Sequence, residues 1–366
     1  METLASGLDT PWAMAFAPDG RIFVTERPGR IRVIDRHGLR AAPWAELPVV
    51  PPEYRSEGGL LGIAVAPDFD STGHVYAVAT FARDGRLANR VLRFTDQDGV
   101  AVHEVVVIDG LPGVRAAPGS EHAIHTHVGG ALAFGPDGML YVTAGDATRP
   151  EAAQDPASLA GKLLRYRPDG SIPADNPDPK SPVYASGLRN PQGLAWNIET
   201  ADMFVTDHGP SELSWERSGG WFGDELNAVV RGGNYGWPEV VGTGGQRGAL
   251  DPLVEWSPSV APAGVTVYSG SHFPWRGNLL VASLRGERLW RIVVDRDEAG
   301  AGWNVARREP LLEGRVGRIR VVAMGPDGHL HLATSNRDSR GKPREGDDHI
   351  YRVVPRPQTA AADGGH

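Results

Sequence analysis

Short apolar runs alternate with turn residues along the whole chain, and one such pattern returns six times. Each copy has an apolar stretch, a turn that is most often Pro-Asp-Gly, and a second stretch in which apolar and polar residues alternate. This pattern predicts two antiparallel strands joined by a tight turn. The copies lie at residues 11–25, 59–69 continued by 74–78, 129–143, 193–207, 264–283 and 322–334.

A further strand follows most copies, with the pattern of an apolar run broken by one arginine. These third strands are expected at residues 29–34, 89–94, 161–166, 287–292 and 348–353. Because no segment shows a sustained helical period, six strand-rich copies predict an all-β protein, a six-bladed β-propeller of four-stranded antiparallel blades. We expect one domain over residues 1–356 and a flexible tail over 357–366, which is rich in Ala and Gly.

The composition agrees with this prediction and narrows the partners. The 47 glycines and 30 prolines are spread between the apolar runs, as many tight turns require. A net charge of −8 argues against nucleic acid as a partner, since phosphate binding needs a basic surface. No apolar run reaches the roughly 18 residues of a membrane span, and the N-terminus shows no signal-peptide pattern. Without cysteine there is no disulfide, thiolate ligand or thiol nucleophile, so the compartment stays open.

Long insertions between the predicted strands indicate where function is concentrated. In a propeller the loops that connect strands gather at the two ends of the axis, so long ones tend to build one functional face. The long insertions lie at residues 112–127, 146–159, 169–182, 209–238 and 336–347.

The first candidate site is a histidine cluster at the entry of the third copy. His127 stands just before Gly129, and Asp146 ends the outgoing strand of the same hairpin. Because a hairpin brings its two ends together, an imidazole and a carboxylate can meet there as an oriented general base. Two other interpretations stay open: surface histidines without a role, or a metal site that also uses His122 and His125.

An arginine and an asparagine stand at the entry of the fourth copy, the position that His127 holds in the third copy. Arg189 and Asn190 precede Pro191 in Leu-Arg-Asn-Pro-Gln-Gly. An arginine held there could polarise an oxygen of a bound ligand, and the alternative is a structural salt bridge.

Turn residues and hard oxygen ligands are dense after the fourth copy. Asp-His-Gly-Pro at 207–210 is followed by Gly-Asp-Glu-Leu-Asn at 223–227 and by Gly-Gly-Asn-Tyr-Gly-Trp-Pro at 232–238. Exposed carbonyls beside carboxylates suit Ca²⁺. The alternative is a glycine-rich loop capped by Asp224 and Glu225.

An arginine pair marks the sixth copy. Arg318 and Arg320 fall on one face of a strand because side chains alternate. Neighbouring guanidiniums repel unless an anion lies between them, so the pair, with Arg285 one blade earlier, indicates a polyanionic small ligand. The alternative is a solvated strand face.

Together these motifs resemble the soluble PQQ-dependent sugar dehydrogenases, in their aldose sugar dehydrogenase branch, over residues 11–353. The joint signature is Glu-Gly-Gly-Leu-Leu-Gly, His-x-Gly-Gly, Leu-Arg-Asn-Pro-Gln-Gly, His-Gly-Pro, Asp-Glu-x-Asn, Asn-Tyr-Gly-Trp-Pro and Arg-x-Arg. The resemblance implies a six-bladed propeller that binds PQQ and Ca²⁺. It also implies oxidation of an aldose at C1 to the lactone, with hydride passing to PQQ and electrons to an external acceptor.

The resemblance also assigns roles to the reacting groups. It makes His127 the base that takes the proton of the sugar C1 hydroxyl, with Asp146 as its orienting partner. Arg189 would lie at the reactive quinone oxygen. Asn190 and Glu57 would line the cofactor.

The remaining roles concern the rest of the cofactor site. Gly209 and Pro210 would offer carbonyl oxygens to Ca²⁺. Arg318 and Arg320 would hold PQQ carboxylates, together with Arg285, which stands where a lysine is usual in the family.

Two rival functions stay open: a Ca²⁺-dependent propeller lactonase or hydrolase, and a non-catalytic sugar- or protein-binding propeller. Ala131 and Leu188 depart from the residues frequent in the family, which favours the second rival. The expected partners are a small aldose sugar and an external electron acceptor, without nucleic acid or a membrane span. We expect a monomer or homodimer and, by the resemblance, a periplasmic or secreted protein.

Overall fold

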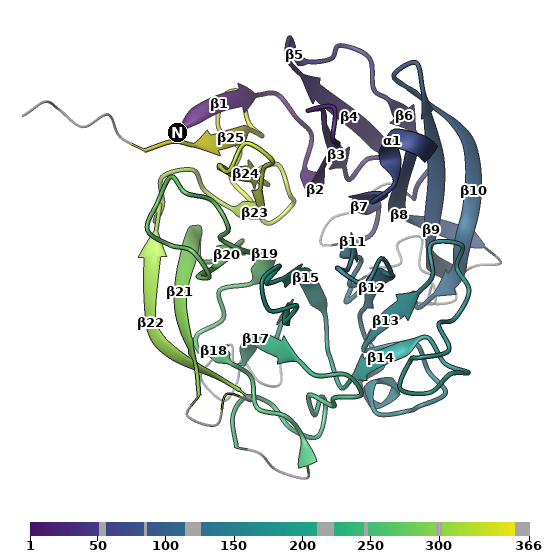
Figure 1. Ribbon diagram of the computed structural model, residues 1–366, viewed down its shortest axis with the longest axis vertical. Helices are drawn as coiled ribbons and strands as arrows, with labels where there is room; N and C mark the ends of the chain where they lie inside the picture. Colours follow the sequence, from purple (N-terminus) through teal and green to yellow (C-terminus); the bar gives the residue numbers. More distant parts are fainter. Residues whose placement is uncertain are drawn as a thin grey trace, which may run out of the picture.

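The chain folds as a six-bladed β-propeller in the computed structural model (Figure 1). The structure describes residues 1–50, 56–83, 86–113, 126–210, 223–244, 248–297, 300 and 302–355. Within this part of the chain, six antiparallel sheets surround a central axis, which confirms the predicted fold. The expected tail, 357–366, lies outside the described residues.

The first three blades follow one another along the chain. Blade 1 has β2 (Pro11–Phe16), β3 (Ile22–Glu26), β4 (Arg30–Asp35), β5 (Gly38–Leu39) and β6 (Ala45–Glu46). Blade 2 has β7 (Leu60–Val65), β8 (His74–Arg83), β9 (Arg86–Gln97) and β10 (Val100–Leu111), with the short helix α1 (Phe69–Thr72). Blade 3 has β11 (Leu132–Phe134), β12 (Leu140–Ala144), β13 (Lys162–Tyr166) and β14 (Val183–Ser186), with the 3₁₀ turn η1 (Pro150–Ala153).

The last three blades complete the ring. Blade 4 has β15 (Pro191–Trp196), β16 (Met203–Asp207), β17 (Asp224–Val229) and β18 (Val254–Trp256). Blade 5 has β19 (Pro262–Val267), β20 (Leu279–Ser283), β21 (Arg288–Arg296) and β22 (Trp303–Leu311). Blade 6 has β23 (Ile319–Met324), β24 (Leu330–Thr334), β25 (Ile350–Val353) and β1 (Glu2–Ala5).

The N-terminal strand closes the ring. β1 pairs antiparallel with β25, with Glu2 opposite Arg352 and Thr3 opposite Tyr351. The carboxylate of Glu2 also accepts a 2.6 Å hydrogen bond from the Arg352 guanidinium. Blade 6 therefore combines the two ends of the chain, and this pairing ties the first residues to the last strand.

Two details of the strand prediction are wrong. The second strands, predicted as alternating with one polar face, are buried on both faces in β3, β12, β16, β20 and β24. The reason is that each blade packs face to face against its neighbours. Residues 224–229, expected within a long loop, form β17, because they pair with β16 and β18.

In three of these second strands, β3, β12 and β16, a buried threonine joins neighbouring blades. The hydroxyls of Thr25, Thr143 and Thr206 donate to the carbonyl oxygens of Leu61, Pro191 and Ala263, at 2.6, 2.9 and 2.6 Å. Each acceptor lies on the inner strand of the next blade. In these three strands, the threonine of the recurring Val-Thr pair therefore forms a hydrogen bond between blades.

Inner strands of all six blades line a central cavity of about 400 Å³. Its walls include mostly apolar residues, and Trp12, Gln192 and Arg320 lie among them. Each of these three falls at a register shift, between Pro11 and Ala13, Pro191 and Gly193, and Ile319 and Val321. A bulge re-aims the side chain at that point, so the three residues meet near the axis.

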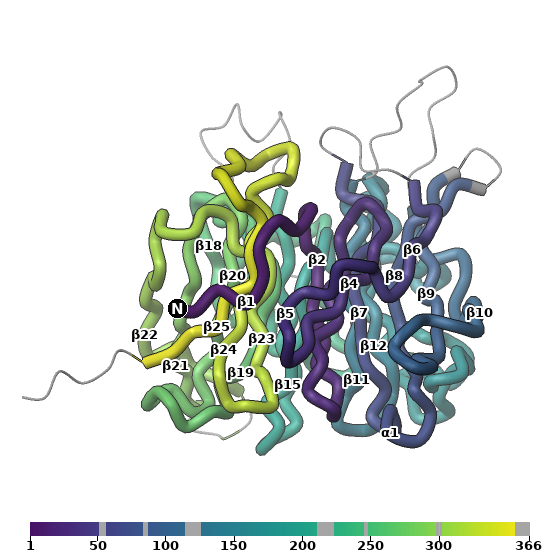
Figure 2. The backbone as a smooth tube through the Cα atoms, turned by 90° about the horizontal axis from the view of Figure 1, so that it is seen from above, coloured from purple at the N-terminus to yellow at the C-terminus, as the bar shows by residue number. Residues whose placement is uncertain are grey.

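The loops gather at the two ends of the axis. Figure 2 shows the 336–347 connection between β24 and β25, in yellow, at the end opposite α1. The candidate active site lies at the end of the axis that carries the 336–347 connection. Among the described residues, no helix has the length and apolarity to span a membrane.

We predict that Thr206→Val lowers the free energy of unfolding by about 1–3 kcal/mol, because the buried Ala263 carbonyl loses its donor. Urea unfolding followed by circular dichroism measures it. Thr3→Val, at an exposed position of the edge strand β1, is the control and should change stability little. Equal midpoints for the two variants would contradict an interblade role for the hydroxyl.

Candidate active site

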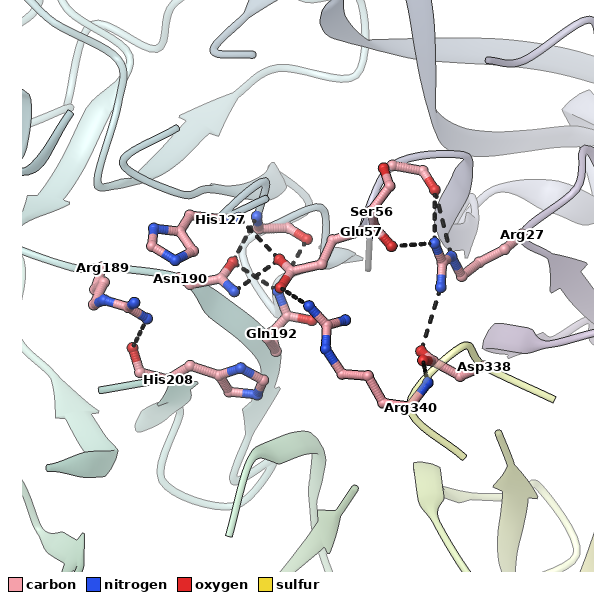
Figure 3. A network of polar contacts seen from close by, with 12 residues as sticks. Arg27, Ser56, Glu57, His127, Arg189, Asn190, Gln192, His208, Asp338 and Arg340 are labelled. Atoms are coloured by element: carbon pink, nitrogen blue, oxygen red, sulfur yellow. Dashed lines mark hydrogen bonds and ion pairs between the residues drawn. The ribbon is translucent and has the colours of Figure 1, made fainter. Parts of the chain in front are cut away.

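The predicted site residues come from five different blades and lie at one end of the axis. Figure 3 shows Glu57, which precedes β7, beside His127, which precedes β11, and Asn190, which precedes β15. Arg189 and His208 lie on one side of them, and Arg27, Asp338 and Arg340 on the other.

His127 and Asp146 meet as the hairpin predicts. The Nδ1 atom of His127 lies 2.8 Å from Oδ1 of Asp146, whose side chain is fully buried. Since a carboxylate accepts, Nδ1 carries the hydrogen and Nε2 keeps its lone pair. The His127 side chain is 13% exposed, which does not fit the surface-residue alternative. His122 and His125, needed for the metal alternative, lie outside the described residues.

The backbone around this pair is close-packed and strained. His127 has φ of 54°, in the left-handed region, and its carbonyl oxygen accepts from the N–H of Ala147 at 3.1 Å. A Cβ on Gly145 would lie 2.0 Å from that oxygen. Glycine at position 145 is therefore what lets the two ends of the hairpin approach.

Glu57 joins His127 to the fourth blade. Its Oε2 atom accepts from the His127 backbone N–H at 2.9 Å and from Nδ2 of Asn190 at 3.0 Å. Burial acts to raise the pKa of Glu57, but the charges that His127 and His208 carry when protonated, the charge of Arg340 and the Asn190 bond outweigh it and lower the pKa to about 2. Glu57 is thus an ionised carboxylate that orients the backbone of His127.

Asp207 holds the two residues that were predicted to touch the ligand. Its carboxylate accepts from the backbone N–H groups of Arg189 and Asn190 at 2.8 and 2.6 Å. Burial, with the charge of Glu225, raises the pKa of Asp207 to about 8. The side chain of Asn190 then links blades, because its Oδ1 accepts from the Gly129 N–H and from Gln192.

One guanidinium nitrogen of Arg189 forms a hydrogen bond, and the other two have no partner among the described residues. Nη1 donates to the His208 carbonyl oxygen at 3.2 Å, whereas Nε and Nη2 are buried without a hydrogen-bond partner in the described part of the chain. Its guanidinium lies 5.4 Å from the centre of the Trp237 ring. Among the described residues Arg189 forms no salt bridge, so the structural alternative is not supported there.

The arginine pair of the sixth blade is buried, contrary to the solvated-face alternative. Arg318 and Arg320 are 7% and 5% exposed. Nη1 of Arg320 donates to Gln192 at 2.7 Å, and its guanidinium lies 3.8 Å from the Trp12 ring centre. Nε of Arg318 and Nη2 of Arg320 have no partner among the described residues.

Three further charged residues complete this cluster, and sequence reasoning missed them. Nη1 of Arg27 lies 3.3 Å from Asp338, Nη2 of Arg318 lies 3.9 Å from the same carboxylate, and Arg340 lies 3.9 Å from Glu57. Arg340 and Asp338 belong to the 336–347 insertion, whose length was the available signal.

The cluster carries more positive than negative charge. Within the described part of the chain, the carboxylates of Glu57 and Asp338 act on this group of four arginines, and Asp9 and Glu287 act in addition on Arg27 and Arg318. Burial, reinforced by the charges of Arg27 and Arg318, lowers the pKa of Arg320 to about 9. The excess charge and the unpaired nitrogens fit a small polyanion. Arg285 is exposed after β20, and its charge acts on Arg318.

The candidate metal ligands are described only in part. Gly209 and Pro210 are buried at the end of β16, and residues 211–222 lie outside the described part. Asp224 is not free as a ligand, because it accepts from the N–H groups of Gly209, Val260 and Ala261 and from the Ser259 hydroxyl. The described residues hold no group of three or more His, Asp or Glu side chains placed for a metal ion.

His208 adds a neutral imidazole to the site. Its Nε2 atom donates to the Pro262 carbonyl oxygen at 2.7 Å, so Nδ1 keeps a lone pair. Burial lowers the pKa of His208 to about 4, which keeps the ring uncharged near neutral pH.

Comparison with known sequences and structures identifies similar proteins. The profile of the Glucose / Sorbosone dehydrogenase family matches residues 8–343. The aldose sugar dehydrogenase YliI of Escherichia coli (strain K12) is 29% identical over 357 residues, which cover 91% of this chain and 89% of that protein.

Two solved structures are similar over nearly the full length. An oxidoreductase (glucose dehydrogenase) from Thermus thermophilus is 43% identical with a TM-score of 0.84, covering 96% of this chain and 99% of that chain. The PQQ-bound aldose sugar dehydrogenase from Streptomyces coelicolor is 38% identical with a TM-score of 0.82, covering 97% of this chain and 96% of that chain.

We predict that Glu57→Gln lowers stability at pH 7 by about 1–3 kcal/mol. Because the folded pKa is about 2 and the ordinary value is 4.5, Glu57 contributes stability that is present above pH 4.5 and is lost as the pH falls toward 2. Urea midpoints of both proteins at pH 7, 4.5 and 3.5 should therefore converge on acidification. Midpoints that stay a constant distance apart would contradict the depressed pKa.

Proposed function

Because the chain belongs to the glucose/sorbosone dehydrogenase family, we propose that it is a PQQ- and Ca²⁺-dependent oxidoreductase that converts an aldose to its lactone. The observation that carries the proposal is the pairing of an oriented base with buried, unpaired arginine nitrogens. His127 is held by Asp146 and Glu57. Arg189, Arg318 and Arg320 carry buried donors that lack partners among the described residues.

The residues present fit the cofactor. PQQ is a tricarboxylate, and a carboxylate is the natural partner for the unpaired nitrogens of Arg318 and Arg320. Arg340 and Arg285 lie in the same cluster and would add charge at its edge. When bound, PQQ supplies the quinone that accepts the hydride.

The protein then has to remove a proton and stabilise developing charge. His127 has Nε2 free as acceptor, and we assign it the proton of the sugar C1 hydroxyl. Asp146 fixes the ring and stabilises the imidazolium that forms. Arg189 would stabilise negative charge on the oxygen that faces its unpaired nitrogens. Gly209 and Pro210 would offer carbonyl oxygens to Ca²⁺.

The finer assignments extend the same proposal. Electrons would pass from the reduced cofactor to an external acceptor, and the sugar would enter at the face that carries the 336–347 loop. We place the protein in the periplasm or outside the cell, as a monomer or homodimer.

Cofactor binding tests the proposal first. The protein, stripped of metal with a chelator, should bind PQQ saturably when Ca²⁺ is added, as followed by quinone absorbance. Arg320→Met should weaken binding by about 10- to 100-fold, the loss expected for a buried charge-assisted hydrogen bond. Arg291→Met, on β21 with its partner Glu309, is the control and should bind normally. Absence of saturable binding by the parent protein would exclude a quinoprotein and leave the hydrolase and binding-module alternatives.

The base is tested separately. We predict that His127→Gln lowers kcat for aldose-dependent reduction of a dye by about 10²- to 10⁴-fold, the usual contribution of a general base, with the Kd for PQQ changed by less than about threefold. The control is His272→Gln, an exposed histidine that contacts the Asp327 carbonyl in the sixth Pro-Asp-Gly turn. A His127→Gln protein with nearly full kcat would show that another group takes the proton.

A further inference from the structure

We infer that Trp237 is a positioning residue for the reaction, which orients Asp146 and supports Arg189 at the same time. This inference rests on the proposed function, because those two residues are the partner of the base and the polarising arginine. Trp237 lies in the connection between β17 and β18 of blade 4. Asp146 follows β12 of blade 3, so the indole joins the two blades.

The indole N–H completes the set of donors around Asp146. It donates to Oδ2 of Asp146 at 2.9 Å. The other oxygen, Oδ1, accepts from Nδ1 of His127 and from the Thr148 N–H, both at 2.8 Å. Because Asp146 is fully buried, these donors take the place of water and fix the plane of the carboxylate. The direction of the His127 ring therefore depends on the indole.

The face of the same indole supports Arg189. The guanidinium carbon lies 5.4 Å from the ring centre, within the range of a cation–π contact. Such a contact fixes the guanidinium without using its N–H groups. Nε and Nη2 thus stay unpaired in the described part of the chain and available to a ligand oxygen.

Trp237 is itself held on both sides. Its backbone N–H donates to the Gly187 carbonyl oxygen at 3.0 Å, and its carbonyl oxygen accepts from Nε2 of Gln154 at 2.7 Å. Gln154 and Asn234 exchange two further hydrogen bonds, of 3.1 and 2.7 Å.

A buried lysine anchors the segment that carries Gln154. Nζ of Lys162 donates to the carbonyl oxygens of Ala152, Ala153 and Ala160 at 2.8 to 2.9 Å. Lys162 is 1% exposed. This anchoring leaves the indole one position, which suits a group that must aim two others.

Several charged and titratable groups surround His127. They are Asp146, Glu57, Arg189, Arg340 and His208. Trp237 contacts Asp146 and Arg189 within this set. A change confined to the indole N–H therefore reaches His127 through Asp146.

The first test is the pH profile of kcat in Trp237→Phe, which removes the N–H and keeps an aromatic face under Arg189. Without the indole donor, the negative charge of Asp146 stabilises the protonated His127 imidazole more strongly. The acid limb of the kcat profile should therefore move to higher pH by about half a unit to one unit. The Kd for PQQ should change by less than about threefold. Trp237→Leu removes the face as well and should also weaken PQQ by about two- to fivefold.

A matched control variant distinguishes this shift of the pH profile from a general loss of packing. Trp44, just before β6 of blade 1, is also buried, and its indole donates at 2.6 Å to the carboxylate of Asp96 on β9 of blade 2, away from the site. Trp44→Phe should lower the Tm as Trp237→Phe does and leave the pH profile unmoved. A Trp237→Phe profile that coincides with that of the parent would overturn the inference.

A second readout needs no cofactor. In protein without PQQ, the ring ¹⁵N signals of His127 should show the Nδ1–H tautomer, and Trp237→Phe should shift the Nδ1 signal while Trp44→Phe does not. This NMR measurement distinguishes failure of the proposed function from failure of the role assigned to Trp237. A protein that does not bind PQQ refutes the proposed function, whereas unmoved ¹⁵N signals refute the role of Trp237.

Discussion

Face-to-face packing of one blade on the next is the constraint on which the rest of the structure depends. It buries both faces of the second strands, so a polar side chain there costs free energy when it has no partner. The hydroxyls of Thr25, Thr143 and Thr206 find that partner on the adjacent inner strand. The same packing brings the starts of the inner strands together at one end of the axis, and the site lies there.

The electrostatics of the site follow from that convergence. Separate blades bring Arg27, Arg189, Arg318 and Arg320 to one end of the axis, where burial removes them from water. Desolvation penalises each charge, and the guanidiniums penalise one another. A protein that keeps such a cluster accepts a cost in stability, and the unpaired nitrogens indicate that an anion offsets it when it binds.

The proposed base, His127, is built in the opposite way, with its described partners in place. Glu57 holds the backbone of His127, and Asp146 holds its ring. Trp237 and Thr148 in turn hold Asp146. A fixed ring with one free nitrogen costs no reorganisation when a proton is taken. One half of the site is thus complete without a ligand, while the other half is complementary to one.

The sequence by itself determined the repeat, the all-β class and the meeting of His127 with Asp146, because period-2 patterning and hairpin closure are local rules. Sequence motifs also identified Arg189, Arg318 and Arg320 as candidate site residues. Only the tertiary structure decided that the second strands are buried on both faces and that 224–229 is a strand, since both depend on neighbouring strands far along the chain. The contacts of Arg27, Asp338, Arg340 and Trp237 could not be predicted for the same reason, although Trp237 lies in the Asn-Tyr-Gly-Trp-Pro motif and residues 336–347 form a long insertion. Each acts on a residue of another blade, and no local pattern records such a contact.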